Sequence, residues 1–500
     1  MLHLEYEKER YRYWISVSKL MKICCYAFAG TALFFRALIE QCSQAGDEVE
    51  WSVIFPQGPF RHSFDDLIPT ERRLYLYEDF GRVYHEQRPP FAWQTRPDIE
   101  SIYLTLAKDK DGYRRLDKDE QLRRAATMMA VYRAFLERMR PDYVLAPDIE
   151  AVDGYILVNL CAELDIPFLH YTELRMLGRS FFSPDVYNTL PPYFGGYTEA
   201  DLAEARAIIA AFRAGRPLRW AQHKHPPSAP PKPPLLRRVV TNTWLRWRQE
   251  RLHASIETFG MRIRINFMPL VTSWRRRYFA WTAAHYFDIK PGDALPPRYI
   301  LYMLHVTPES SINAFSPYFV DQFRAIDLIL QNMPGDGVLV VKEHPSSMAM
   351  RPDGYYASLR RRPGLVLAHP EIPSRHLIEN AAAIVSVTGT VGLECYFLDK
   401  PCLLLAPVFF GHLCRRLDSL DKLREQLIEM IHSYHPPSAE EKAIAIAKLI
   451  NIGGEFIIND PWFVPSVCAP SNVAATRDFM WKHLRRLKEV PTHRDLAARG

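Results

Sequence analysis

Short apolar runs alternate along this chain with longer segments whose apolar residues recur every three or four positions. The short runs are typical of buried strands, and segment 31–46 between two of them has helical spacing that ends at Gly46. A longer amphipathic helix is predicted over 116–139. Strands that alternate with helices favour βαβ units and a parallel sheet. The strands predicted in this half of the chain are 22–30, 49–55, 73–77, 142–148 and 166–171.

A proline-rich stretch, His223–Leu236, interrupts this pattern. Its sequence, "HKHPPSAPPKPPLL", can be neither a helix nor a central strand and predicts a stiff, extended connector. The alternation then resumes, and the tail from residue 417 on has a helical and polar pattern. The second half is predicted to contain strands at 299–304, 337–342, 364–368, 383–387 and 402–406, with helices at 318–332, 352–361, 373–381 and 391–398.

Together these patterns predict an α/β protein of two Rossmann-like parallel-sheet domains with a cleft between them. Ligands of such proteins bind at the carboxyl ends of the strands, often between the domains. The predicted parts are an N-terminal domain (1–222), the proline-rich connector with a basic helical segment (223–297), a C-terminal domain (298–416) and a helical tail (417–500).

The composition and the N-terminal sequence indicate where in the cell the protein is expected. With 500 residues and 48% hydrophobic content, the chain can bury two or more cores. The N-terminus lacks the apolar region of a signal peptide, and no run of about 18 uncharged apolar residues occurs. None of the eight cysteines forms a CxxC pair or a metal-ligand spacing. We therefore expect reduced cysteines and a cytoplasmic protein, with peripheral contact to the inner membrane face as an option.

Polar and ionisable side chains follow three predicted strands of the second domain. A buried strand gains nothing from such residues, whereas a site at the carboxyl end of a parallel strand would use them. The three groups are His305 and Glu309 after strand 299–304, then Lys342, Glu343 and His344 at the end of strand 337–342, and Thr388, Gly389 and Thr390 after strand 383–387, with Glu394 one turn into the next helix.

The third group has the clearest chemistry. A strand, the sequence T-G-T and a helix place backbone N–H groups and two hydroxyls at a helix N-terminus, which favours an anion. Glu394 is then placed to accept hydrogen bonds from ribose hydroxyls. The alternative is an ordinary Thr N-cap with a capping-box Glu. In the second group, His344 can donate to a phosphate oxygen and Lys342 adds charge, and the alternative is a solvated surface turn.

Candidates for acid–base catalysis come from both domains. His305 and Glu309 could serve, because a cleft can tune either pKa toward neutrality. The alternative for Glu309 is that it orients a loop. In the first domain, "YTELRMLGRS" follows a strand and offers Glu173, Arg175 and Arg179 to the cleft if the two domains close. The alternative for these residues is a set of structural salt links.

Several of these stretches resemble the capsular polysaccharide biosynthesis family. They are "LHVTPESS", "DQF", "PGDGVLVVKEHP", "SVTGTVGLE" and "DKPCLLLAPVFF", within residues 298–411, and "RPDYVLAPD" and "LDIPFLHYTELRMLGR" match the first domain more weakly. The family includes the Kdo transferases that start capsule lipid linkers, and the wider group are GT-B glycosyltransferases with two Rossmann domains. The His-Pro of "KEHP" is also similar to the HP motif of bacterial sialyltransferases, which use CMP-sugars.

The resemblance implies a donor that is CMP-Kdo-like or another nucleotide sugar, and a glycan or glycolipid acceptor. It implies that His344 binds the nucleotide phosphate, that the turn Thr388–Thr390 lies where phosphate is held, and that Glu394 binds ribose. No metal or other cofactor is expected, because GT-B enzymes hold the nucleotide by protein groups and the second domain has no DxD triplet. The candidates for nucleotide binding are Lys342, Glu343, His344, Thr388, Gly389, Thr390 and Glu394, and those for catalysis are Glu309, His305 and Glu173.

The segment Arg237–Trp281 is basic and aromatic. Up to Arg277 it has ten arginines against two acidic residues, and tryptophans are interleaved with them. One interpretation is a patch for an anionic membrane face. Another is a groove for an acidic glycan or lipid-linked acceptor, and a third is a solvated helical hairpin whose arginine stems cover apolar surface. Nucleic acid is not expected as a partner, because no recognition motif accompanies the charge.

Three functions remain open from the sequence. The first is a glycosyltransferase that builds a surface or capsular polysaccharide or its lipid-linked precursor. The second is a sugar-nucleotide epimerase or hydrolase on the same fold, which needs acids and bases from both domains around one sugar. The third is a non-catalytic component of capsule assembly that keeps a degenerate nucleotide site.

Overall fold

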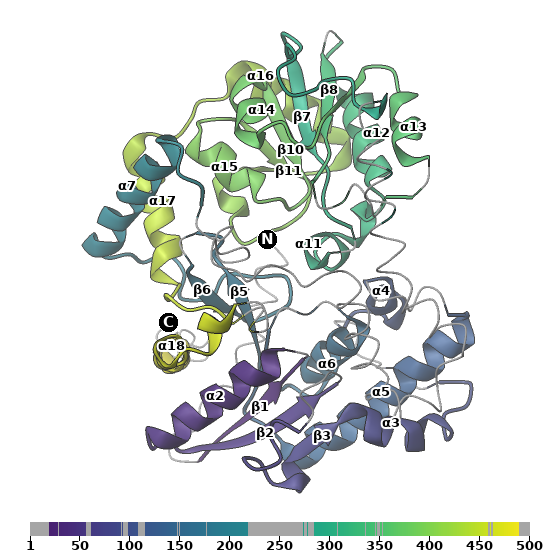
Figure 1. The fold of residues 1–500 in the computed structure, drawn as a ribbon, viewed down its shortest axis with the longest axis vertical. Coiled ribbons are helices and arrows are strands. Elements are labelled where there is room, and N and C mark those ends of the chain that lie inside the picture. The colour runs from purple at the N-terminus through teal and green to yellow at the C-terminus, as the bar shows by residue number, and fades with distance from the viewer. Residues whose placement is uncertain are drawn as a thin grey trace, which may run out of the picture.

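The protein contains two six-stranded sheets that share one strand order. The structure, a computed structural model, shows them in separate halves of the molecule, the first below and the second above in Figure 1. It describes residues 20–28, 30–56, 62–91, 93, 99–108, 116–147, 149, 151–176, 178–218, 274, 278, 285–307, 309–335, 337–345, 347, 351–352, 354–458, 461 and 464–489.

The first sheet has the order β3-β2-β1-β4-β5-β6. Its neighbouring strands are parallel except β5 and β6, which are antiparallel. β6 was not predicted, because its sequence "SFFS" is too short to show a period. The strands are β1 (Met21–Tyr26), β2 (Val49–Phe55), β3 (Arg73–Tyr75), β4 (Tyr143–Ala146), β5 (Phe168–Glu173) and β6 (Ser180–Ser183).

The second sheet has the order β12-β11-β10-β7-β8-β9 and is parallel throughout. Numbered within its own half, this is again the order 3-2-1-4-5-6 of a doubly wound fold. The prediction of two Rossmann-like domains of the GT-B type is therefore confirmed. The strands are β7 (Tyr299–Met303), β8 (Val338–Lys342), β9 (Leu365–Ala368), β10 (Ala383–Ser386), β11 (Cys402–Leu404) and β12 (Arg415–Arg416).

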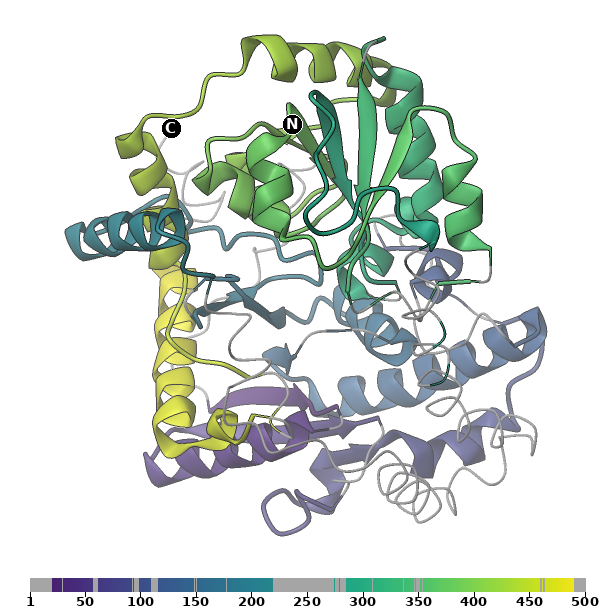
Figure 2. The ribbon, with the colours of Figure 1, turned by 45° about the horizontal axis from the view of Figure 1, so that its top comes forward.

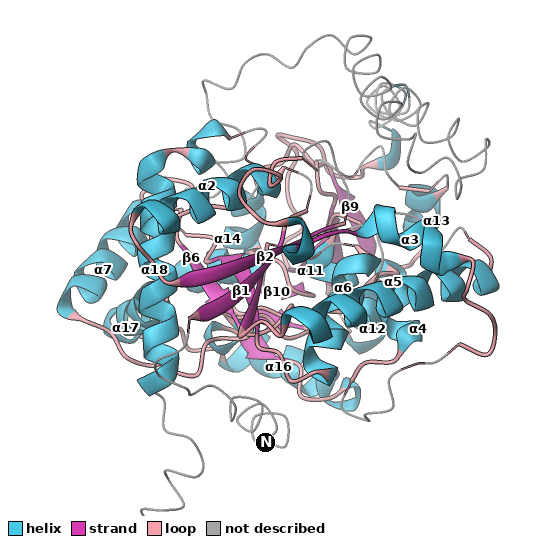
Figure 3. Ribbon diagram, turned by 90° about the horizontal axis from the view of Figure 1, so that it is seen from below, coloured by secondary structure: helices cyan, strands magenta, loops and turns pink. Residues whose placement is uncertain are grey.

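Helices cover both faces of the first sheet, because alternate residues of each strand point to opposite sides. Ile23 and Cys25 of β1 lie in one apolar cluster with α2 (Thr31–Gln44) and α18 (Pro470–Glu489). Cys24 and Tyr26 lie in another cluster with helices of the opposite face. Figure 3 shows this layering from below. The helices of the opposite face are α3 (Leu76–Tyr84), α4 (Ile102–Ala107), α5 (Lys118–Met139) and α6 (Val152–Glu163).

The second sheet is covered in the same way. On one face, strand residues pack with α12 (Gln322–Asn332), α13 (Tyr355–Arg360) and α16 (Leu423–Ser433). On the other face they pack with α14 (Ser374–Asn380), α15 (Val391–Phe397), α17 (Ala439–Asn451) and α7 (Glu199–Arg213). α7 comes from the predicted N-terminal domain, yet Phe212 at its end contacts Phe397 of α15, with ring centroids 5.2 Å apart.

The C-terminal helices run from one half of the molecule to the other. In Figure 2 the yellow α18 descends along the side of the molecule to the first sheet. There Asp47, just after α2, accepts hydrogen bonds from Arg477 and from the Trp481 indole. The predicted helical tail 417–500 therefore packs on both halves. Segment 285–289 of the predicted connector packs on the second half, where Ile289 forms a bridge with Ala368.

Several predicted elements have different bounds in the structure, and two of them have a clear local cause. The strand expected at 73–77 ends at Tyr75, because α3 begins at Leu76. The helix expected from 318 begins at Gln322, after a 3-10 turn at Pro317–Phe319, and Asp321 caps it through the amide of Phe323. The basic segment Arg237–Trp281 lies outside the described residues except for Trp274 and Tyr278, both of which are exposed.

Candidate active site

The carboxyl ends of β7 and β10 form the centre of the candidate site. These adjacent strands mark the point where the strand order of the second sheet reverses, and ligands of doubly wound sheets bind there. His305 follows β7 and Thr388 follows β10, and the Thr388 amide donates a hydrogen bond of 3.2 Å to Nε2 of His305. Two loops that are far apart in the sequence are thereby joined across the switch point.

His305 is held as a neutral imidazole. Its ring is buried, and burial lowers its pKa to about 4, with the positive charge of Arg351 as the next contribution. Nε2 accepts a hydrogen bond from the Thr388 amide, so a proton on this ring belongs on Nδ1. His305 is placed to hold the two loops together, and its predicted catalytic role stays a prediction.

Two residues that were not predicted as site residues fix the His305 backbone. The Gln322 side chain accepts from the His305 amide at 2.7 Å and donates to its carbonyl at 2.9 Å. Arg351 donates to the same carbonyl at 2.8 Å. Gln322 belongs to the "DQF" stretch that carries part of the family resemblance. Arg351 had no signal in the sequence, because its contacts are formed only when the loops after β7 and β8 come together.

The turn after β10 is tightly packed. Thr388 is buried and its hydroxyl donates to the carbonyl of Ser311, at 2.5 Å. Gly389 donates its amide to the Ser386 hydroxyl at 3.0 Å. A Cβ atom at Gly389 would lie 2.7 Å from Ser386 Oγ and 3.3 Å from His305 Nε2. Only glycine fits at this point, so the approach of the turn to His305 depends on residue 389.

Thr390 and Glu394 do not form the capping box considered as the alternative. Thr390 occupies the N-cap position of α15, but its side chain makes no capping hydrogen bond. Glu394 lies one residue beyond the position that a capping box requires. Burial raises the pKa of Glu394 to about 7, and the nearby Lys342 charge opposes this shift. Its carboxyl group makes no hydrogen bond with any residue that the structure describes.

The three residues at the end of β8 have different environments. The Lys342 ammonium is buried and donates to the Pro370 carbonyl at 3.1 Å, and burial lowers its pKa. Glu343 is fully buried, and Arg351 donates to both of its carboxylate oxygens at 2.9 Å. Tyr356 donates to it as well, at 2.8 Å. The Glu343 carboxylate therefore accepts its hydrogen bonds from within the protein.

His344 is the exposed member of the three. Its pKa is lowered by partial desolvation, while the nearby Glu309 and Glu343 charges oppose the shift. Glu309 also accepts a hydrogen bond from the Ser311 hydroxyl at 2.9 Å. Ser311 in turn accepts from Thr388, so the loops carrying Glu309, His344 and Thr388 meet at one edge of the sheet.

The first domain presents a turn after β5 to this edge. Glu173 is the last residue of β5, and Arg175 follows it at the carboxyl end. The positive charge of Arg175 is one of the contributions that lower the pKa of His305, after burial and the charges of Arg351 and His344. Arg179 instead donates to Glu204 at 2.8 Å and to Glu455 at 3.0 Å. It forms the structural salt link considered as the alternative.

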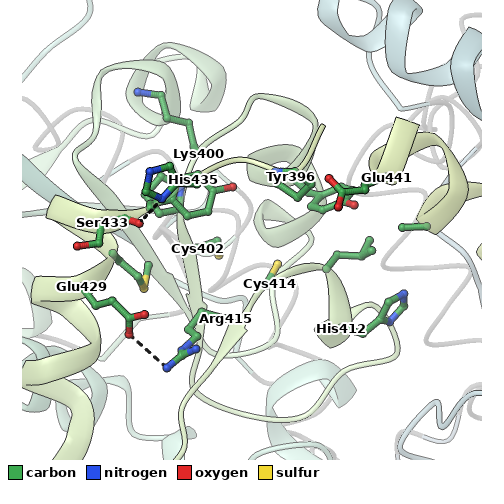
Figure 4. A pocket seen from close by; sticks show the side chains of 16 residues that line it. Tyr396, Lys400, Cys402, His412, Cys414, Arg415, Glu429, Ser433, His435 and Glu441 are labelled. Carbon is green, nitrogen blue, oxygen red and sulfur yellow. Dashed lines mark hydrogen bonds and ion pairs between the residues drawn. The ribbon is translucent and has the colours of Figure 1, made fainter. Parts of the chain in front are cut away.

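A cavity of about 560 Å³ lies away from this edge. Its lining includes Cys402 at the start of β11 and Arg415 at the start of β12, so it opens at the amino ends of the strands. Figure 4 shows Arg415 paired with Glu429 on one side of it. It contains none of the predicted site residues. Within the described part of the chain, no group of three or more His, Cys, Asp or Glu residues could hold a metal.

The segment that contains the candidate site matches a known protein family. Residues 270–412 match the family described as capsule polysaccharide biosynthesis protein. The match spans every candidate residue of the second domain and confirms the resemblance predicted from the sequence. A comparison with curated proteins gave no match.

Solved structures similar to this chain include two transferases and an epimerase. The beta Kdo 2,7 transferase KpsC of Thermosulfurimonas dismutans is 12% identical, covers 64% of this chain and 80% of its own, and has a TM-score of 0.29. The UDP-GlcNAc 2-epimerase of Methanocaldococcus jannaschii is 12% identical, with coverages of 86% and 99% and a TM-score of 0.24. The calicheamicin glycosyltransferase CalG4 is 13% identical, with coverages of 95% and 100% and a TM-score of 0.25. The fold assignment rests on the strand order of the two sheets.

Proposed function

We propose that this protein is a glycosyltransferase of surface polysaccharide synthesis. It would move a sugar from a nucleotide donor, CMP-Kdo-like or another nucleoside-phosphate sugar, to a capsular polysaccharide or its lipid-linked precursor. The position of the candidate residues is the main support for the proposal. They lie at the carboxyl ends of β7, β8 and β10, inside the segment that matches the capsule family.

The roles follow from the environments of the side chains. His344 would donate to the nucleotide phosphate, together with the turn Thr388–Thr390. Glu394 has no hydrogen-bond partner among the described residues and would accept ribose hydroxyls. Glu309 and Glu173, one from each domain, are the candidates for the catalytic base. We further propose that these protein groups hold the donor without a metal.

Membrane contact is a separate part of the proposal. Among the described residues no helix is long and apolar enough to cross a membrane. Trp274 and Tyr278 are exposed, and in the sequence they flank Arg275, Arg276 and Arg277. Aromatic rings at the headgroup level with arginines at the phosphates would hold the protein on an anionic membrane face, near a lipid-linked acceptor.

Release of nucleotide from defined donors tests the proposed activity. Purified protein is incubated with CMP-sugars and UDP-sugars, with and without a capsular or lipid-linked acceptor, and nucleotide and sugar products are followed. We expect release of one nucleotide type, faster when acceptor is present. Interconversion of the donor sugar without release would favour the epimerase alternative, and no turnover of any donor would favour the non-catalytic one.

A further inference from the structure

We propose that Arg175 of the first domain binds an oxyanion of the donor that the loops of the second domain hold. The inference rests on the proposed function, because it assigns a contact to the same nucleotide sugar. Residues of both domains would then form the donor site. The second domain supplies the loops after β7, β8 and β10, and the first domain supplies one guanidinium.

The backbone of Arg175 has an unusual conformation for an arginine. Its φ is 60°, in the left-handed region that side chains with a Cβ rarely adopt outside Asn and Asp. Such a conformation persists only where the surrounding structure over-determines it, and it is frequent at ligand sites. Arg140 also has a positive φ, but it caps the C-terminus of α5, whereas Arg175 lies in the turn between β5 and β6.

The turn that holds Arg175 is rigidly anchored. Leu174 donates its amide to the Arg179 carbonyl at 2.9 Å, which closes the turn. The Leu174 and Met176 side chains on either side of Arg175 are buried, with exposed fractions of 0% and 1%. Arg179 fixes the far end of the turn through Glu204 and Glu455. The position of Arg175 is thus set by its neighbours in the chain.

This turn also packs directly toward the second domain. Leu174 and Met176 belong to one apolar cluster with Val391 and Leu393 of α15. Figure 1 shows β5 and β6, which flank the turn, in the part of the first domain nearest the second. The charge of Arg175 also contributes to the lowered pKa of His305, which lies at the switch point of the second sheet. Arg175 therefore lies beside the loops that carry the candidate nucleotide site.

The Arg175 side chain is partly buried and makes no hydrogen bond or ion pair with any residue that the structure describes. A partly desolvated guanidinium normally has partners, because its five donors lose their water. Arg179, four residues on, shows this with its two carboxylates. An anionic ligand at the candidate site would supply the acceptors that Arg175 lacks, because a guanidinium can donate two parallel hydrogen bonds to a phosphate or a carboxylate.

Binding measurements with three variants test the inference. Arg175→Gln removes the charge, and Arg175→Gly removes the charge and relieves the left-handed backbone. Arg206→Gln is the charge-matched control, since Arg206 is exposed on α7 and pairs only at the surface with Glu440. CMP, UDP and a CMP- or UDP-sugar are titrated by calorimetry, cytidine and uridine are titrated by ligand-observed NMR, and melting temperatures are recorded.

We expect both Arg175 variants to bind the nucleotide about 10- to 100-fold more weakly than wild type, the scale of a lost charge-assisted contact. Cytidine or uridine binding should be unchanged if the oxyanion is the donor phosphate. If only the sugar nucleotide is weakened and the free nucleotide is not, the oxyanion is a carboxylate on the sugar. Arg175→Gly should melt no lower than wild type while it loses binding.

Two results would overturn the inference. One is nucleotide and donor affinity in Arg175→Gln equal to that of Arg206→Gln. The other is a melting temperature of Arg175→Gly that falls far enough to account for its loss of binding, which would make Arg175 a structural residue. If wild-type protein binds none of the nucleotides or sugar nucleotides, the proposed function fails and the role of Arg175 fails with it.

Discussion

Among single residues, Glu394 has the surroundings that are hardest to explain by ordinary packing. Its pKa is raised to about 7 by burial, and no described residue satisfies its oxygens. A carboxyl group whose pKa is raised in the folded state stabilises the fold below its unfolded value of 4.5, and this contribution is lost as the pH rises through 7. The folded protein therefore carries a cost at Glu394 at neutral pH, which a bound ribose would offset.

Replacing this carboxyl group should separate stability from binding. We expect Glu394→Gln to melt higher than wild type at pH 8, by a free-energy difference on the order of 1 kcal/mol after allowance for its partial exposure, and to match wild type at pH 4.5. The same variant should bind a ribonucleotide more weakly, with a smaller loss for the 2′-deoxy analogue. Thermal scans at the two pH values and calorimetry check this. A pH-independent difference in melting temperature would contradict the burial of the carboxylate.

Glu343 shows what the sequence could not predict at this scale. Its position beside His344 suggested a ligand contact, whereas its carboxylate is closed by Arg351 and Tyr356. Arg351 lies eight residues further along, and no local pattern indicates that the two will pair. The rule that sites lie at strand ends predicted that these loops would meet at one edge of the second sheet, as the hydrogen bonds among them show. It could not tell which side chains of a strand end turn inward.

The buried pair predicts a stability effect. Glu343→Gln would leave the Arg351 guanidinium buried without a compensating charge, which should lower the free energy of unfolding by about 3–5 kcal/mol. Glu440→Gln is the control, because its pair with Arg206 is exposed and should change stability by less than about 1 kcal/mol. Urea denaturation measures both. Equal stability of the two variants would show that the Glu343 pair does not hold the site together.

At the scale of elements, the turn between β10 and α15 decides how closely the two central loops approach. The sequence predicted this turn well, because a strand, a glycine-containing turn and a helix have separate and adjacent signals. β6 and the 3-10 turn before α12 were not predicted. A four-residue antiparallel strand has almost no period of its own, and its existence depends on pairing with β5.

Gly389→Ala tests the turn. The added Cβ would lie 2.7 Å from Ser386 Oγ and 3.3 Å from His305 Nε2. We expect the turn to shift, the bond from Thr388 to His305 to weaken, and stability to fall by about 1–3 kcal/mol. Nucleotide affinity should fall as well. Gly335→Ala is the control, since a Cβ there meets nothing within 4 Å. Wild-type affinity in Gly389→Ala would show that the turn is not part of the site.

At the scale of the whole molecule, the chain crosses between its halves more often than the sequence suggested. α7 packs on the second sheet, and α18 returns to the first. Contacts such as Arg477 with Asp47 join residues that are more than four hundred positions apart. The local periodicity of a sequence carries no signal for such contacts. It therefore predicted only that the C-terminal residues are helical, not where they pack.

Calorimetric titration of CMP and UDP into wild type and His344→Ala measures whether a nucleotide binds at the carboxyl ends of the second sheet, as we propose. His376→Ala, an exposed histidine on α14, is the control. We predict that wild type and the control bind one nucleotide alike, and that His344→Ala binds it about 10- to 150-fold more weakly, because a charge-assisted hydrogen bond to phosphate is lost. Equal affinity in all three proteins would contradict the claim.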